Sequence, residues 1–216
     1  MDKRKESVSV DLSQDRTERD RLGIERLVFF SDAVFAIAMT LLVLDIRLPA
    51  GVETANNHQL LLLLTGLWHK YLAYFISFWV IGLYWISHHR KFLLIKRWDH
   101  LLLSLNLLLL MVIAFIPFPT AVMSENGNLT ATVFYALVMA LAGITQMILW
   151  WHASGDNKLL DMHLDRTQRW REVAPPLASV VIFLLSIGVA FFDLNLVRII
   201  WVLIPPLSIY LRRRYN

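Results

Sequence analysis

Apolar residues in this chain are gathered into long blocks, which short polar segments separate between residues 27 and 211. A helix that crosses the hydrocarbon core of a bilayer needs about 20 predominantly apolar residues. Six blocks reach or approach that length, so the pattern predicts an all-α membrane protein with six transmembrane helices. The predicted spans cover residues 27–48, 60–87, 100–118, 129–151, 173–192 and 194–211.

The boundary between the fifth and sixth blocks is the least distinct part of this pattern. Only a few residues around Asp193 separate the two blocks, and Pro205 and Pro206 interrupt the sixth. The alternative is one long bent segment in place of two helices, which would give five spans. Pro175 and Pro176 are expected in the first turn of the fifth span, where proline is tolerated.

The distribution of positive charge favours six spans. Cytoplasmic loops carry the excess of lysine and arginine in membrane proteins. Of the 21 such residues, 18 lie in the N-terminal arm, after the second block, after the fourth block and at the C-terminus. Six spans place all four of these segments on one side, so both termini are predicted to be cytoplasmic.

The chain divides by polarity into three parts. Residues 1–25 are predicted to form a polar cytoplasmic arm, solvated and partly disordered. Residues 26–212 form the transmembrane domain, and residues 213–216 form a basic tail. Apolar residues make up 57% of the chain and charged residues only 18%, which is too apolar for one soluble core. The lipid bilayer is therefore an expected partner, and the basic residues follow the membrane edges rather than forming a nucleic-acid surface.

Motifs for catalysis and for cofactor binding are absent from the sequence. The glycines are isolated and form no GxG, so there is no dinucleotide or phosphate loop. The chain has no cysteine, which excludes disulfides and thiolate metal sites. We find neither an HExxH motif nor a nucleophile–base pair. The sequence thus predicts that the protein is not an enzyme and holds no cofactor.

The first block contains an acid, Asp32, in an otherwise apolar stretch. A carboxylate inside a membrane is costly and usually faces protein or water, often with a functional role. One interpretation is a structural pair with Arg26 or with another span, and the other is a functional group. At 100° per residue, Ile37, Leu41 and Leu44 share one face. Asp32 lies roughly opposite and so turns inward, toward its own subunit. On spacing alone, such an aliphatic stripe is typical of ordinary helix packing.

Adjacent histidines, His88 and His89, end the second block. Neighbouring residues do not share a helix face, which argues against a two-histidine metal site. Either both are interfacial side chains at a helix end, or one of them hydrogen-bonds Asp32 or a neighbouring group. Asn106 in the third block also needs a partner in lipid. Asp45, at the outer end of the first block, is expected to be solvated.

The residues Arg26-x-x-x-Phe30-Ser31-Asp32 stand at the start of the first block. This string resembles the RxxxFSD signature of the transmembrane protein 175 family, the endosomal and lysosomal potassium channels and their bacterial relatives. The AVFAIAMTLLVLDI that follows and the YWxxHH that ends the second block are also similar to that family. Animal members carry two six-span repeats and pair as dimers. A chain with one signature therefore resembles a single-repeat bacterial member, expected to form a homotetramer.

The resemblance implies a potassium-permeable cation channel in a bacterial inner membrane. In the family the first span of each subunit lines the pore, and hydrophobic side chains there provide selectivity. The matching positions here, five, nine and twelve residues after the motif aspartate, are Ile37, Leu41 and Leu44. Thr40 is expected to offer a hydroxyl to the ion. Permeating potassium is the only metal ion that the resemblance implies.

In the family, the motif residues hold the first span against the second and third. The residues expected in this network are Arg26, Phe30, Ser31, Asp32, Trp85, either His88 or His89, and Asn106. The alternative function is a secondary transporter or a proton-coupled carrier, with Asp32 and His88 as a proton relay. The missing internal repeat argues mildly against a carrier, because many carriers contain inverted repeats.

Overall fold

The computed structural model describes residues 2–49, 56–155, 159–160, 163–204 and 206, with side chains from residue 18 onward. These residues form helices and short connections, and the single β-type bridge among them pairs Ile95 with Leu160. The elements, of which η1 is one 3-10 turn, are α1 (Asp2–Leu41), η1 (Leu42–Asp45), α2 (Asn57–Gly66), α3 (Trp68–Leu94), α4 (His100–Phe115), α5 (Pro117–Asn126), α6 (Leu129–Ser154), α7 (Arg166–Ala190) and α8 (Leu194–Val202).

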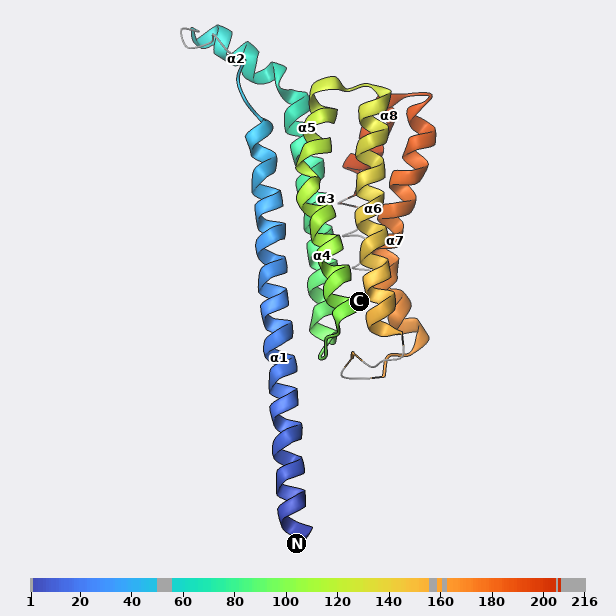
Figure 1. The fold of residues 1–216 in the computed structure, drawn as a ribbon. Helices are drawn as coiled ribbons and strands as arrows, with labels where there is room; N and C mark the ends of the chain where they lie inside the picture. The colour runs from blue at the N-terminus through green and yellow to red at the C-terminus, as the bar shows by residue number, and fades with distance from the viewer. Residues whose placement is uncertain (1, 50–55, 156–158, 161–162, 205, 207–216) are drawn as a thin grey trace.

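The long helical segments run side by side and form a bundle (Figure 1). The segments that are long and apolar enough to cross a membrane are Glu18–Asp45, Trp68–Leu94, His100–Asn126, Leu129–Ser154 and Arg166–Ala190. The predicted all-α membrane architecture is therefore confirmed, with five candidate spans in the described residues. α8 adds a helix of 9 residues, and much of the rest of the predicted sixth span lies outside the described residues. Six spans and cytoplasmic termini remain predictions.

The chain breaks its helical path between α7 and α8. α7 ends at Ala190, and Asp193 Oδ1 accepts hydrogen bonds from the backbone N–H groups of Asn195 at 2.7 Å and Leu196 at 3.4 Å. A side-chain cap of this kind satisfies the free N–H groups at the start of a new helix. The structure therefore has two helices here and not one long bent segment.

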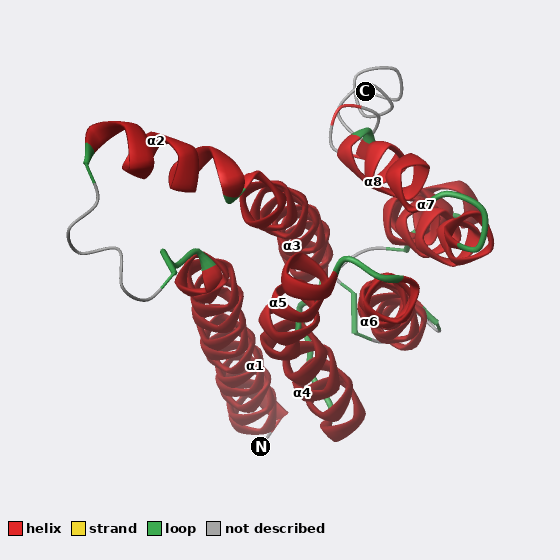
Figure 2. Ribbon diagram, turned by 90° about the horizontal axis from the view of Figure 1, so that it is seen from above, coloured by secondary structure: helices red, strands yellow, loops and turns green. Residues whose placement is uncertain are grey.

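The second span begins at Trp68, so the prediction of a start near residue 60 is wrong. The leucines at 60–64 belong to α2, which projects sideways from the end of α3 and buries none of its residues (Figure 1, Figure 2). Asn56 and Gln59 form a reciprocal capping box that begins α2, and α2 ends at Gly66. A hydropathy window registers apolar composition and misses such a change of direction.

The third span is longer than predicted, because α4 and α5 together run from His100 to Asn126. Pro117 occupies the start of α5, where its missing N–H is not needed. α5 ends at Gly127, whose φ of 57° is left-handed and suits a glycine after a helix. The predicted end of this span near residue 118 is therefore wrong.

The fifth span begins at Arg166 rather than near residue 173. Asp165 and Gln168 form a capping box at its start. Pro175 and Pro176 consequently lie inside α7 and not in its first turn, which corrects the prediction. Proline inside a membrane helix is tolerated where neighbouring groups compensate for the lost N–H donor.

The N-terminal arm is helical, which differs from the partial disorder that its polar sequence predicts. α1 runs without a break from Asp2 into the span and extends beyond the bundle (Figure 1). Residues 2–22 contain neither glycine nor proline. Oppositely charged residues one turn apart also support a helix, as Arg21 Nε and Glu25 Oε1 do at 3.6 Å.

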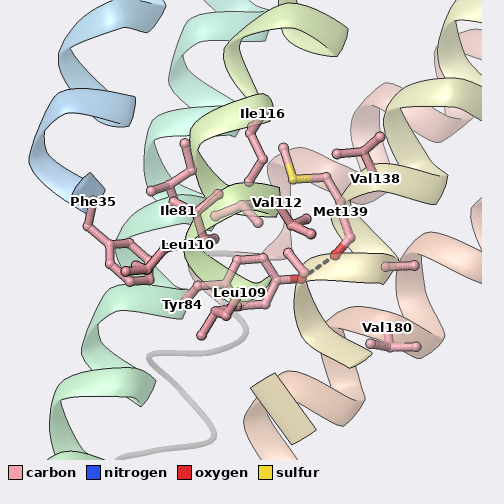
Figure 3. Close-up of a cluster of buried hydrophobic side chains, with 14 of the residues drawn as sticks. Phe35, Ile81, Tyr84, Leu109, Leu110, Val112, Ile116, Val138, Met139 and Val180 are labelled. Carbon is pink, nitrogen blue, oxygen red and sulfur yellow. Dashed lines mark hydrogen bonds between the residues drawn. The ribbon is translucent and has the colours of Figure 1, made fainter. Parts of the chain in front are cut away.

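The hydrophobic core lies among α3, α4, α6 and α7, with α1 against one side of it (Figure 3). Its buried side chains include Phe35, Ile81, Leu109, Met139 and Val180. The Tyr84 hydroxyl lies within this core, where it donates to the carbonyl oxygen of Met139 at 2.8 Å and lies 3.0 Å from Ser179 Oγ. These contacts join α3, α6 and α7, whereas α1 packs against α3 and α4.

α6 and α7 approach each other closely at Gly143. A Cβ atom there would lie 2.5 Å from Cγ2 of Val180 and 3.2 Å from the carbonyl oxygen of Pro176. We expect Gly143→Val to lower the free energy of unfolding by about 1–3 kcal/mol, because overpacking displaces α7. Thermal unfolding in detergent measures the change. Gly188→Val, at a position with open space around it, is the matched control. Equal losses in both variants would contradict the close-approach explanation.

Candidate ion pathway

One face of α1 packs against the rest of the chain. The buried residues recur every three or four positions, as a single helix face requires. They are Leu27, Ser31, Phe35, Ala38 and Leu42. α1 contacts α3 and α4, and it stands at the edge of the bundle in the view from above (Figure 2).

The opposite face of α1 is open. Ile37, Leu41 and Leu44 are 57%, 42% and 55% exposed, and Thr40 between them is also exposed. The four residues predicted to line a pathway thus lie together where no other described part of the chain covers them. Leu44 belongs to η1, and residues three apart align in a 3-10 helix, which keeps Leu44 in line with Leu41.

Thr40 is the one polar side chain among these four residues. Its hydroxyl donates to the carbonyl oxygen of Ile37 at 2.9 Å, so its oxygen keeps lone pairs that a cation could contact. Leu41 and Leu44 offer only hydrocarbon. No three histidine or acidic side chains cluster as a metal site would among the described residues.

A chain of hydrogen bonds ties the buried face of α1 to α4 and α3. Asn106 on α4 donates from Nδ2 to Ser31 Oγ at 2.9 Å, and its Oδ1 lies 2.9 Å from Nε2 of His88 on α3. Ser31 in turn donates to the carbonyl oxygen of Leu27 at 2.7 Å. Because an amide oxygen only accepts, His88 carries its proton on Nε2. Ser31, His88 and Asn106 are at most 1% exposed, so water does not compete for these bonds.

His88, and not His89, is the partner of Asn106. The His88 ring stacks on Phe92 with centroids 4.3 Å apart and lies 5.5 Å from the ring of Phe35 on α1. The His89 ring lies 5.7 Å from that of Trp85 instead. The 100° rotation between successive residues of α3 separates the two histidines in this way.

Asp32 makes a second link between α1 and α3. Trp85 donates from Nε1 to Asp32 Oδ1 at 2.8 Å. Arg26 is exposed and forms no hydrogen bond or ion pair with any described group, so the pairing of Arg26 with Asp32 is not present. Phe30 is 52% exposed and follows the open face of α1 at helical spacing. The structure thus brings together five of the residues expected in the network and leaves Arg26 and Phe30 outside it.

Comparison with known proteins decides the family. Residues 26–117 match the family described as endosomal/lysosomal potassium channel TMEM175. A potassium channel of Streptomyces collinus is 38% identical over an alignment of 179 residues, which covers 77% of this chain and 82% of the relative. This chain belongs to the TMEM175 family. A potassium channel of Chamaesiphon minutus is 40% identical over 185 residues, covering 77% of this chain and 89% of the relative.

A solved structure shares the fold of this TMEM175 chain. The crystal structure of a lysosomal potassium-selective channel TMEM175 homolog from Chamaesiphon minutus matches with a TM-score of 0.75 at 34% identity. The match covers 91% of this chain and 100% of that one. The family resemblance carried by the RxxxFSD string is therefore confirmed. TMEM175 is a family of ion channels, so the prediction that the chain is not an enzyme is also confirmed. The segment that matches the family contains the whole open face of α1 and all of the network.

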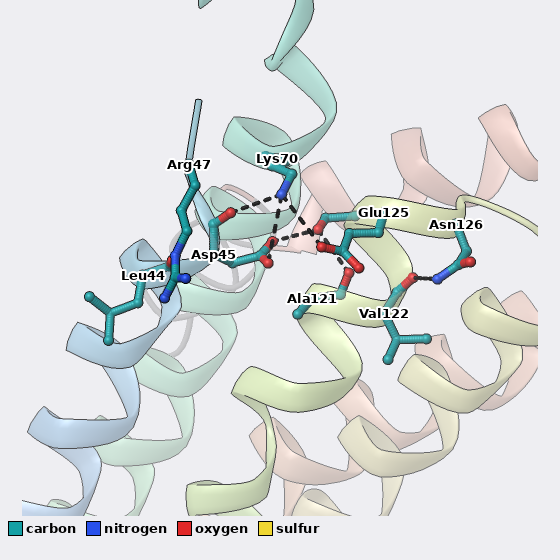
Figure 4. A network of polar contacts seen from close by, with 9 residues as sticks. Leu44, Asp45, Arg47, Lys70, Ala121, Val122, Glu125 and Asn126 are labelled. Carbon is teal, nitrogen blue, oxygen red and sulfur yellow. Dashed lines mark hydrogen bonds and ion pairs between the residues drawn. The ribbon is translucent and has the colours of Figure 1, made fainter. Parts of the chain in front are cut away.

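Sequence reasoning missed a polar cluster around η1 in this TMEM175 chain. Lys70 Nζ donates to the carbonyl oxygen of Asp45 at 2.9 Å, and Ser124 Oγ donates to Asp45 Oδ2 at 2.6 Å (Figure 4). The expectation of a solvated Asp45 is wrong, because its side chain is only 19% exposed. The sequence contained one indication of this cluster. Lys70 is a lone lysine inside an apolar run, and such a charged side chain needs a partner.

Proposed function

We propose that this TMEM175 chain forms a potassium-permeable cation channel, in which α1 of each of four identical subunits lines a central pore. The observation that carries the proposal is the open face of α1. Ile37, Leu41 and Leu44 line up there with Thr40, and no described part of their own chain covers them. Relatives named as potassium channels align with 77% of this chain, which supports potassium as the ion.

The composition of the open face indicates that α1 packs against other helices around a common axis, and that this face does not contact lipid alone. Ala33 lies about one turn before Ile37 on this face and is exposed, as is Thr40. Small and hydroxyl side chains let membrane helices approach closely, whereas a lipid-facing surface has no need of them. A closed ring of identical subunits buries this face equally in every copy.

Ile37 is proposed as the narrowest ring of side chains, with Leu41 and Leu44 next toward the outer side. Branched aliphatic side chains around one axis leave a dry passage, in which an ion sheds water and gains no polar replacement. Potassium sheds water at a lower cost than sodium, so selectivity arises as a difference in dehydration. Such a ring also gates by dewetting, and a small change in its radius alters the flux strongly.

The network on the other side of α1 supports this arrangement by setting the rotation of the helix. Asn106 holds Ser31 toward α4, and Trp85 holds Asp32 toward α3. With both bonds made, the face that carries Ile37 points away from the subunit. The network therefore acts on the pore by fixing the orientation of α1, and its residues do not contact the ion.

The carrier alternative requires a proton relay between Asp32 and His88. No hydrogen bond joins these two described side chains, because Asp32 is bonded to Trp85 and His88 to Asn106. An indole N–H and a carboxamide are poor groups for passing a proton onward. The geometry consequently favours the channel.

We place the channel in the inner membrane of a bacterium, with both chain ends in the cytoplasm. Bacterial relatives support the compartment, and the concentration of lysine and arginine in four segments supports the orientation. In this orientation η1 and α2 lie at the outer surface of the membrane.

Unitary currents test the proposed function. Purified protein in a planar lipid bilayer should produce stepwise potassium currents, because a pore passes ions far faster than a carrier turns over. Native mass spectrometry should give an assembly of four chains. A stable monomer or dimer, or potassium transport without unitary steps, would contradict the proposal.

A further inference from the structure

Lys70 joins three elements at the η1 end of the bundle. Its Nζ, on the first turn of α3, lies 2.9 Å from the carbonyl oxygen of Asp45, 3.8 Å from Asp45 Oδ1 and 3.7 Å from Glu125 Oε1 on α5. Ser124 on α5 adds its hydrogen bond to Asp45 Oδ2. Polar contacts thereby tie η1, which continues the proposed pore-lining helix, to both α3 and α5 (Figure 4).

The Asp45–Lys70 link is the strongest part of this cluster. The two side chains are 19% and 20% exposed, whereas Glu125 is 60% exposed. Water and salt screen an exposed ion pair more than a shielded one, so Glu125 contributes less. Asp45 is also the only one of these residues that belongs to η1, which makes it the point through which the cluster acts on α1.

A cavity of about 530 Å³ lies beside the link. Its lining includes Leu41, Leu44, Asp45, Leu67, Lys70 and Pro117. Side-chain packing between η1 and the neighbouring helices is therefore incomplete at this level. The position of η1 accordingly depends on the polar link more than on close packing, which would otherwise resist displacement.

We propose that Asp45 and Lys70 are positioning residues that set the width of the outer part of the pore. This inference rests on the proposed function, because it takes α1 as the pore-lining helix. The link holds η1 back against α3 and α5. When it is broken, η1 moves toward the pore axis, and the rings formed by Leu41 and Leu44 become narrower. In a dry passage a small narrowing lowers the ion flux strongly.

Lys70→Gln and Arg47→Gln form a matched pair of test variants. Each removes one positive charge from the η1 end of the proposed pore, but Arg47 donates from Nε to the carbonyl oxygen of Leu44 in its own turn, at 2.8 Å. We expect Lys70→Gln to reduce the unitary potassium conductance about threefold. Arg47→Gln should leave the conductance unchanged or slightly higher, because losing a positive charge favours cations at the mouth. Lys70→Arg keeps a charged donor and should retain most of the conductance.

A spin-label pair measures the position of η1 without any current. The chain has no cysteine, so Leu48→Cys and Phe192→Cys can be labelled selectively. Both native side chains are exposed, at 46% and 92%. Leu48 follows η1, and Phe192 belongs to the connection between α7 and α8, which lies at the η1 end of the bundle (Figure 1). Labelled chain is diluted in unlabelled chain, so that the measured distance is between the two labels of one chain. Lys70→Gln should shift and broaden the distribution of this distance, and Arg47→Gln should not.

The two measurements separate the positioning role from its alternatives. Equal changes in Lys70→Gln and Arg47→Gln would overturn the inference, since charge alone would then explain both. If Lys70→Gln fails to assemble, Ser124→Ala replaces it, and a label distance that does not move in this variant overturns the inference. A native chain without unitary current contradicts the proposed channel, and the label distances then decide the positioning role by themselves.

Discussion

Ile37→Asn is expected to raise the unitary conductance and to lower the preference for potassium over sodium about tenfold, which corresponds to about 1.4 kcal/mol. Ile37 is 57% exposed on the open face of α1, where the proposed ring offers an ion only hydrocarbon. An asparagine amide gives a partly dehydrated ion a polar partner, so the barrier falls for both ions. The difference in barrier height between potassium and sodium also becomes smaller, because that difference comes from the cost of removing water from each ion.

Reversal potentials in mixed potassium and sodium solutions measure this preference. Leu41→Ala should raise the conductance with a smaller loss of preference, because it widens the passage and adds no polar group. Leu185→Asn makes the same kind of substitution at a position on α7 that is 67% exposed, and it should change neither quantity. Unchanged selectivity in Ile37→Asn together with a collapse in Thr40→Ala would instead assign discrimination to the threonine hydroxyls.

Asn106→Leu is expected to weaken assembly while leaving the selectivity of the remaining channels unchanged. The substitution removes the group that bonds both Ser31 Oγ and His88 Nε2 in a fully buried site. Each unpaired buried group costs about 1–3 kcal/mol, and hydrogen bonds between membrane helices lie toward the low end of that range. These bonds lie within one chain, so a total loss of about 2 kcal/mol would lower the ratio of folded to unfolded chain more than tenfold, and only folded chain assembles.

Two conservative variants serve as controls for Asn106→Leu. Arg26 is exposed and bonds no described group, so Arg26→Ala should assemble normally. Asp32→Asn keeps an oxygen that can accept from Trp85 and should lose little. Native mass spectrometry gives the assembled fraction, and thermal unfolding gives the stability of the same samples. A loss in Arg26→Ala as large as that in Asn106→Leu would contradict the role of Asn106 as the main bridge.

The ends of the spans show where reasoning from apolar blocks fails. Five blocks correspond to helices that could cross a membrane, but the second helix begins at Trp68 and the fifth at Arg166. The fifth begins early because the side chain of Asp165 caps it at a polar residue. The second begins late because a separate helix, α2, which the side chain of Asn56 caps, takes up the leucines before Trp68. A hydropathy average gives such residues no weight as starting points, so it places the ends by composition alone.

The sequence by itself determined the features that depend on one segment. The alignment of Ile37, Leu41 and Leu44 on a face opposite Asp32 follows from 100° per residue along the predicted first span, and the 3-10 turn η1 leaves it intact. The RxxxFSD string was sufficient to indicate the family. The spans were visible because the free energy of transfer into a bilayer is nearly a sum over the residues of one segment.

Only the tertiary structure decided which polar groups meet. Asn106 bonds Ser31, 75 positions away, and Lys70 bonds Asp45, 25 positions away. The choice of His88 over His89 likewise depends on how α3 is rotated against α4. A buried polar group is paired by whichever helix lies beside it at the right depth and rotation. Those quantities are set by the packing of the whole bundle, and no local pattern in the chain contains them.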